Sequence, residues 1–78
     1  MDWLDVYWDA DIEKHLAQHG VSREDFEKVI RDPIGEDSSD SSGRPIRFGF
    51  AEDGRKIAAV YEMVDEVTVL PITAYEVK

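Results

Sequence analysis

The spacing of apolar residues changes once along this chain. Between residues 9 and 33 apolar side chains recur every three or four positions, which is the repeat of a helix that buries one face. After residue 45 they alternate with polar or small residues, which is the repeat of a half-buried strand. This order predicts an α+β domain in which two N-terminal helices pack on a small antiparallel sheet of three or four strands.

The ends of the two predicted helices are marked by residues suited to helix caps. Asp9 or Asp11 can cap the first helix, and Gly20 is placed to end it. Ser22 is a good cap for the second helix, which should stop before Pro33 because proline disfavours helical dihedrals in the preceding residue. The sequence therefore predicts two short helices that meet at a tight corner.

Val21 is expected to pack in two directions at that corner. Its position directly after Gly20 predicts a contact with Leu16, as in a Schellman motif. Its position before Ser22 predicts a second contact with Phe26, as in a hydrophobic staple.

The remaining chain predicts strands and turns. A short strand is expected within residues 1–8, and Asp53-Gly54 predicts a hairpin turn. Pro71 indicates an edge, a bulge or a bend in the last strand. The three longer strands are expected at 46–51, 57–64 and 67–77, and the middle one should be central and covered on both faces because it is almost continuously apolar.

Residues 35–43 form a polar run of Ser, Asp, Glu and Gly that predicts a flexible loop. It lacks the lysine of a phosphate-binding loop and the closing glutamate of an EF-hand, so a solvated linker is the preferred interpretation. Near the N-terminus, Trp3, Tyr7 and Trp8 are interpreted as core residues, with a protein interface as the alternative.

Composition narrows the class of protein. Seventy-eight residues suit a single domain, 1–78, and the absence of cysteine excludes disulfides and thiol chemistry. Apolar stretches are too short to cross a bilayer, so a cytoplasmic protein without a membrane partner is expected. A net charge of −9 disfavours nonspecific nucleic-acid binding and favours cationic partners. No cofactor and no metal are expected.

The order of several short motifs resembles the BrnT family of toxins from type II toxin–antitoxin systems. The resemblance implies a small RelE-like fold, RNA cleavage and an antitoxin-like protein partner, and it extends over nearly the whole chain. Its motifs are Trp8-Asp9, His19-Gly20-Val21, Phe26-Glu27, Asp32-Pro33, Gly49, Gly54-Arg55, Val60-Tyr61 and Ile72-Thr73-Ala74.

This sequence departs from the family at several basic positions. Gln18 stands where the family usually has lysine, and Leu70 and Tyr75 stand where it usually has arginines. The family's basic C-terminal segment is also missing from the sequence. These departures imply a divergent member with weakened activity.

RNA cleavage would need an acid or base and cations to bind phosphate. His19 is the candidate acid or base, and Arg47 and Arg55 are the candidate phosphate ligands. Additional candidate binding residues are Arg44, Lys56, Tyr61 and Tyr75. The four cations 44, 47, 55 and 56 lie in or beside one hairpin, which predicts a local basic patch, and RNA is an expected partner only if that patch suffices.

Each candidate also has a structural interpretation. His19 suits the C-terminal end of a helix, where a cation complements the dipole, and this is preferred to catalysis. His15 and His19 are one turn apart, but the sequence offers no third metal ligand at a recognisable spacing. Arg47 is interpreted as a solvent-facing strand residue, and Arg55 as a turn residue or an ion-pair partner.

Two classes of function follow from the sequence. The first is a toxin-like endoribonuclease of a toxin–antitoxin pair. The alternative is a non-catalytic protein-interaction module of the same fold, which the uncharged residues at positions 70 and 75 favour.

Overall fold

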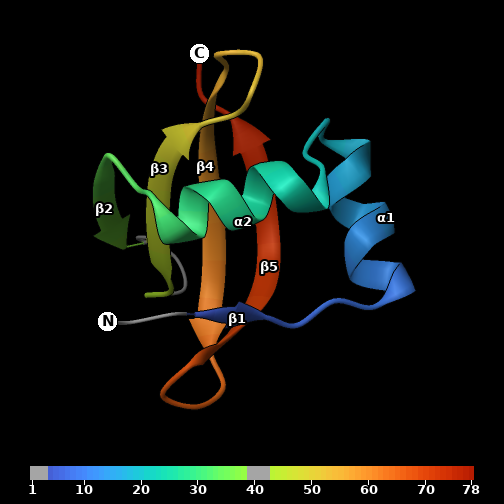
Figure 1. Cartoon of the computed structure of the whole chain (residues 1–78), viewed down its shortest axis with the longest axis vertical. Helices are drawn as coiled ribbons and strands as arrows, with labels where there is room; N and C mark the ends of the chain where they lie inside the picture. The colour runs from blue at the N-terminus through green and yellow to red at the C-terminus, as the bar shows by residue number, and fades with distance from the viewer. Residues whose placement is uncertain (1–3, 39–42) are drawn as a thin grey trace.

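The computed structural model describes residues 4–38 and 43–78 (Figure 1). Two short helices lie between a brief first strand and four further strands. The elements in chain order are β1 (Asp5–Val6), α1 (Ala10–Gln18), α2 (Arg23–Arg31), β2 (Gly35–Ser38), β3 (Pro45–Phe50), β4 (Lys56–Met63) and β5 (Thr68–Glu76).

The strands form one sheet in the order β1-β5-β4-β3-β2. β1 runs parallel to β5, and every other neighbouring pair is antiparallel. The predicted α+β class is confirmed, but the sheet has five strands and is mixed. The two additional pairings involve β1 and β2, at the two edges of the sheet.

The helix caps form as the sequence predicts. The side chain of Asp9 accepts a hydrogen bond from the Ile12 N–H at 2.8 Å, and that of Ser22 accepts one from the Asp25 N–H at 3.1 Å. α2 ends at Arg31, and its C-cap residue Asp32 lies directly before Pro33. Both helices therefore begin with a side chain that satisfies one of their unpaired amides.

The predicted corner between the helices is confirmed in its hydrogen bonds. The Val21 N–H donates to the Leu16 carbonyl, and the Gly20 N–H donates to the Ala17 carbonyl, both at 3.0 Å. These two bonds are those of a Schellman motif. Gly20 has φ +76°, which is unfavourable for other residues. Val21 is buried in the same cluster as Leu16 and Phe26.

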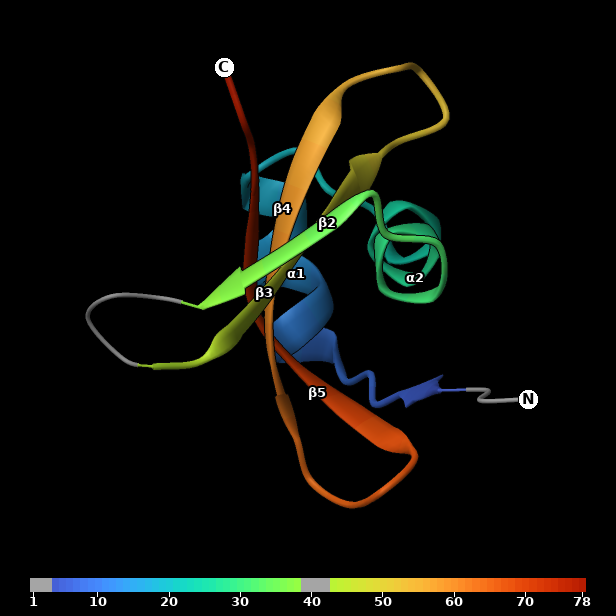
Figure 2. The same cartoon turned by 90° about the vertical axis from the view of Figure 1, so that its left-hand side faces the viewer.

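Both helices cover the same face of the sheet. α2 lies over β3 and β4, and α1 lies against β5 (Figures 1 and 2). Gly49 permits this packing, because a Cβ there would lie 3.2 Å from a methyl group of Val29 on α2. The main core fills the space between the layers and contains Leu16, Val21, Phe26, Val29, Ile30, Ala51, Ile57, Ala59, Tyr61, Val69 and Ala74.

Trp8 extends this core toward the N-terminus. Its ring meets Phe26 edge to face, with centroids 5.6 Å apart, and its Nε1–H donates to Glu27 at 2.7 Å. Trp8 is thus a core residue, as predicted, whereas Tyr7 is exposed. Trp3 lies outside the described residues.

A second, smaller apolar cluster lies on the opposite side of the sheet, which we call the outer face. Ile46, Ala58 and Val60 are its buried members, and Phe48, Ile72 and Val77 pack around them. Alternation along the strands adds other side chains to this face, and the additional members are Asp37, Phe50, Lys56, Glu62, Leu70 and Tyr75. Within the described residues, no helix covers it (Figure 2).

The predicted flexible loop needs correction. Residues 35–38 of this segment form β2, which pairs with β3, and residues 39–42 lie outside the described residues.

The predictions for the longer strands are confirmed. β4 is the central strand, and its residues 57–61 are buried on both faces, with helices on one face and the smaller apolar cluster on the other. The hairpin turn forms with Gly54 at φ +88°, and the strand pairing shifts register between Val60 and Tyr61, opposite the segment with Pro71.

Within the described residues, neither helix is long and apolar enough to span a bilayer.

Candidate functional site

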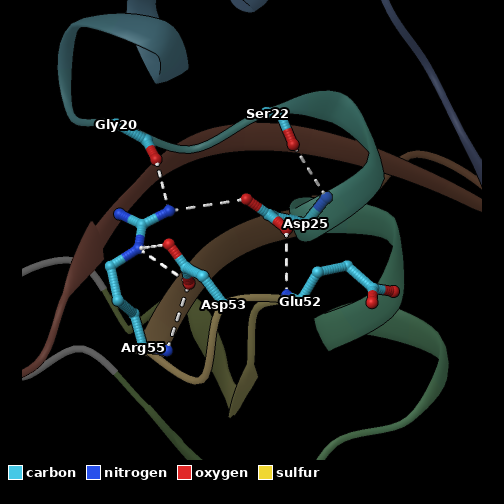
Figure 3. Close-up of polar contacts among 6 residues, drawn as sticks. All are labelled: Gly20, Ser22, Asp25, Glu52, Asp53 and Arg55. Carbon is cyan, nitrogen blue, oxygen red and sulfur yellow. Dashed lines mark hydrogen bonds and ion pairs between the residues drawn. The ribbon is translucent and has the colours of Figure 1, made fainter.

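Arg55 joins three parts of the fold (Figure 3). Its Nη2 donates to the carbonyl of Gly20 at 2.9 Å, at the corner between the helices. The same nitrogen lies 3.6 Å from Oδ2 of Asp25 on α2, and Nε lies 2.8 Å from Oδ2 of Asp53 in the hairpin turn. A single guanidinium thus connects the end of α1, the start of α2 and the turn between β3 and β4.

Two carboxylates balance the charge of Arg55. The backbone N–H of Arg55 donates to Asp53 at 3.3 Å, and this bond, assisted by the guanidinium, lowers the pKa of the Asp53 carboxyl below its ordinary value of 3.8. Asp25 also accepts the Glu52 N–H at 3.4 Å, as Figure 3 shows. Arg55 is therefore a paired structural residue, and its neighbourhood is not electropositive.

Arg47 occupies a similar position at the other end of α2. Its Nη1 donates to the carbonyl of Ile30 in the last turn of the helix. Its Nε donates to Oε1 of Glu36 on β2 at 3.1 Å, and the guanidinium lies over the ring of Tyr61, 5.6 Å from the centroid. The arginine satisfies a helix-terminal carbonyl, which is a common position for a cation.

The three candidate catalytic residues do not gather at one place. His19 caps the C-terminus of α1 beside Gly20, so it lies near Arg55. Arg47, however, binds the opposite end of α2, and nine helical residues span about 13 Å. A scissile phosphate contacted by Arg55 would therefore lie too far from Arg47 for both to bind it.

The two histidines form an exposed pair on α1. Their ring centroids are 5.2 Å apart, and Nε2 of His15 is 3.1 Å from Oγ1 of Thr73 on β5. Across 4–38 and 43–78, no group of three or more potential metal-ligating side chains occurs. The pair fits a helix C-terminus, as the structural interpretation of His19 predicts.

The four cations near the hairpin do not form the predicted basic patch. Lys56 lies on the outer face with its Nζ 5.5 Å from the centroid of Phe48, whereas Arg47 points toward the helices beside Ala59. Arg44 lies 3.9 Å from Glu62. Strand alternation thus sends neighbouring cations to opposite faces, and Arg44, Arg47 and Arg55 each pair with an acid.

The two tyrosines among the candidate binding residues differ in exposure. Tyr61 faces the helices and is buried in the main core, where it supports Arg47. Tyr75 lies on the outer face opposite Ala58 and remains 42% exposed. Only Tyr75 is accessible to a partner.

Sequence reasoning did not identify the outer face as a functional surface. The alternation of Ile46, Phe48 and Phe50 indicates one buried face, and the apolar run of β4 indicates two. Two short helices can cover only one face of a sheet, however. The sequence therefore already indicated that the apolar residues of the other face would have no helix over them. Phe50 is 45% exposed there.

No protein-family model matches this sequence, and no curated protein or solved structure matches the chain.

Proposed function

We propose that this chain is a non-catalytic protein-interaction module with a BrnT-like toxin fold, and that it binds a protein through the outer face. The observation that carries the proposal is the apolar cluster around Ile46, Ala58 and Val60, which no helix covers in the described part of the chain. Ile46, Ala58 and Val60 are themselves buried, so the accessible part of this face is the aromatic rings beside them. Exposed aromatic rings are typical of interfaces. Phe50 and Tyr75 supply such rings here.

The contacts of the arginines support a non-catalytic role. Arg47 and Arg55 bind helix-terminal carbonyls and carboxylates, so binding phosphate would require each to give up stabilising partners. The motif order that resembles the BrnT family supports the fold and origin of the chain. In this proposal the chain keeps a protein-binding role and lacks the family's ribonuclease activity.

Endoribonuclease activity is the second candidate, and one arrangement favours it. His19 is exposed and adjoins Gly20, whose carbonyl binds Arg55. One acid or base and one guanidinium therefore lie together at the corner between the helices.

Site-specific photocrosslinking tests the interaction proposal. A benzophenone amino acid is introduced at Tyr75 on the outer face or, as a control, at exposed Lys14 on α1. Illumination of cells that make the protein should give a discrete protein adduct from position 75 and none from position 14. The absence of any adduct specific to position 75 would contradict the proposal.

An RNA cleavage assay tests the second candidate. Messenger RNA, free or on ribosomes, is incubated with the wild type and with the His19→Ala, Arg47→Ala, Arg55→Ala triple variant. Equal background cleavage by both is expected, and cleavage that only the wild type performs would establish the ribonuclease. A small adjacent reading frame for a basic, DNA-binding protein would support a toxin–antitoxin context for either candidate.

A further inference from the structure

We propose that the occupant of the outer face is a second copy of this chain, packed face to face about a two-fold axis with the two β4 strands antiparallel. This inference rests on the proposed function, because it names the partner of the same surface. Two sheets that pack in this way lie about 10 Å apart with their strands roughly aligned. Each sheet would then have helices on one side and the other copy on the opposite side.

The first observation is the charge balance of the outer face. The chain as a whole carries 18 acids and 9 basic residues. Among the described residues of the outer face and its rim, however, Arg44 and Lys56 are matched by Asp37 and Glu62. The other described acids lie on the helices, the turns and the sheet edges, away from the proposed interface, so identical outer faces can meet without strong local repulsion.

The second observation is the order of charges along β4. The outward side chains of this strand are Lys56 at one end, then Ala58 and Val60, and finally Glu62. A two-fold axis across the strand at the level of residue 59 places Lys56 of each copy opposite Glu62 of the other. The same axis places Ala58 opposite Val60. The charges of the two β4 strands therefore complement each other only when the strands run antiparallel. In a parallel arrangement each charge would face its own counterpart.

The third observation is the exposure of aromatic rings on this face. Ala58 is flanked by Phe48 on β3 and Tyr75 on β5 in the strand pairing, and it is fully buried. Tyr75 is 42% exposed and Phe50 is 45% exposed, so these two rings form the apolar surface that a second copy can reach. Aromatic residues are enriched in the buried centres of interfaces.

A cationic partner fits this face less well. The net charge of −9 attracts cations at long range, but Arg44 and Lys56 lie at the surface where such a partner would dock. Lys56 also lies over the ring of Phe48 and blocks a basic side chain from that ring. Within the described residues no acid pairs with Lys56, and a second copy of the chain would place Glu62 beside it.

Two charge-reversal variants test the arrangement. Lys56→Glu and Glu62→Lys are examined singly and mixed, by light scattering and sedimentation, over about 1–500 µM to include micromolar and weaker interfaces. The wild type should reach twice the 8.9 kDa monomer mass. In a dimer of either single variant, residues 56 and 62 carry the same charge and meet twice, once on each side of the two-fold axis. The dissociation constant of the dimer should therefore rise by about tenfold or more.

The mixture distinguishes the antiparallel arrangement from any other. A heterodimer of the two single variants contains two restored opposite-charge contacts, so mixing should recover association near that of the wild type. The matched controls are Lys14→Glu and Glu13→Lys on α1, which change charge equally but lie away from the outer face, and neither should weaken the dimer. Both outer-face positions are exposed, and urea midpoints verify that each variant stays folded.

A monomeric wild type throughout this range would overturn the inference, as would single variants that dimerise normally or a mixture that does not recover. The photocrosslinking experiment at position 75 shows whether only the second copy is ruled out or the proposed protein-interaction function as well. An adduct of twice the monomer mass supports both proposals. An adduct of any other mass overturns the second copy and leaves the interaction module standing, and the absence of an adduct overturns both.

Discussion

Arg55 shows how one side chain can hold a small fold together. Its guanidinium has a planar fork of donors, which lets it bind the Gly20 carbonyl and two carboxylates at once. A lysine would offer a point charge on a flexible stem and could not match all three directions. Its 29% exposure leaves these contacts partly shielded from solvent.

Removal of this side chain should destabilise the fold. We expect Arg55→Ala to lower the free energy of unfolding by about 1–2 kcal/mol, because charge-assisted hydrogen bonds to Gly20 and Asp53 are lost. Arg55→Lys should recover less than half of that loss. Urea melts measure both, with Lys14→Ala as a surface control that should stay within about 0.5 kcal/mol of the wild type. A similarly small effect of Arg55→Ala would mean that the guanidinium contacts contribute little.

At the scale of elements, the corner between α1 and α2 could be predicted in detail. Each of its signals is local: Gly20 ends one helix, Ser22 caps the next, and Val21 lies within a few residues of both contacts. Such features can be predicted from the sequence because the interacting residues are only a few positions apart and do not depend on contacts with distant strands.

Val21→Ser tests that corner. Val21 is 1% exposed, so the substitution removes two buried methyl groups and places a hydroxyl in the core. We expect a loss of about 1–2 kcal/mol in the free energy of unfolding. The control is Val64→Ser, since Val64 is 56% exposed. Urea melts that show a loss below about 0.3 kcal/mol for Val21→Ser would contradict the packing described for this residue.

A short strand within residues 1–8 was predicted and is β1, but β2 and the pairing partners of both edge strands could not be predicted, and the reason is physical. β2 consists of Gly35, Glu36, Asp37 and Ser38, which are poor strand formers, and it exists because β3 supplies a ladder and Arg47 binds Glu36. β1 has two residues and depends on β5, which is more than sixty positions away. Such pairings depend on tertiary contacts rather than on local periodicity.

The candidate site was predicted less well than the helices. With 18 acids in the chain, the sequence cannot show which acid each arginine will meet. Strand register decides this: Arg47 lies opposite Glu36 on β2 and beside Ala59 on β4. The expectation that Arg55 completes a turn or an ion pair is confirmed, whereas a solvent-facing Arg47 is wrong.

At the scale of the whole molecule, charge predicts weak binding to RNA. The net charge of −9 repels phosphates, and the cations near the hairpin point to different faces, with Arg44, Arg47 and Arg55 already paired with acids. We expect nonspecific single-stranded RNA to bind with a dissociation constant of about 10⁻⁴ M or weaker at roughly 150 mM salt. Titration of a labelled strand measures this, and micromolar affinity would favour the ribonuclease instead.

The attachment of α2 at both ends has a consequence for how the chain folds. Arg47 and Arg55 come from β3 and the turn that follows it, which are made after the helix during synthesis. Arg47 nevertheless binds a carbonyl in the last turn of α2, and Arg55 binds Asp25 in its first turn. A nine-residue helix is marginal by itself in water. The helix therefore becomes stable only when the hairpin has formed, and the two make a single cooperative unit that opens and closes as a whole.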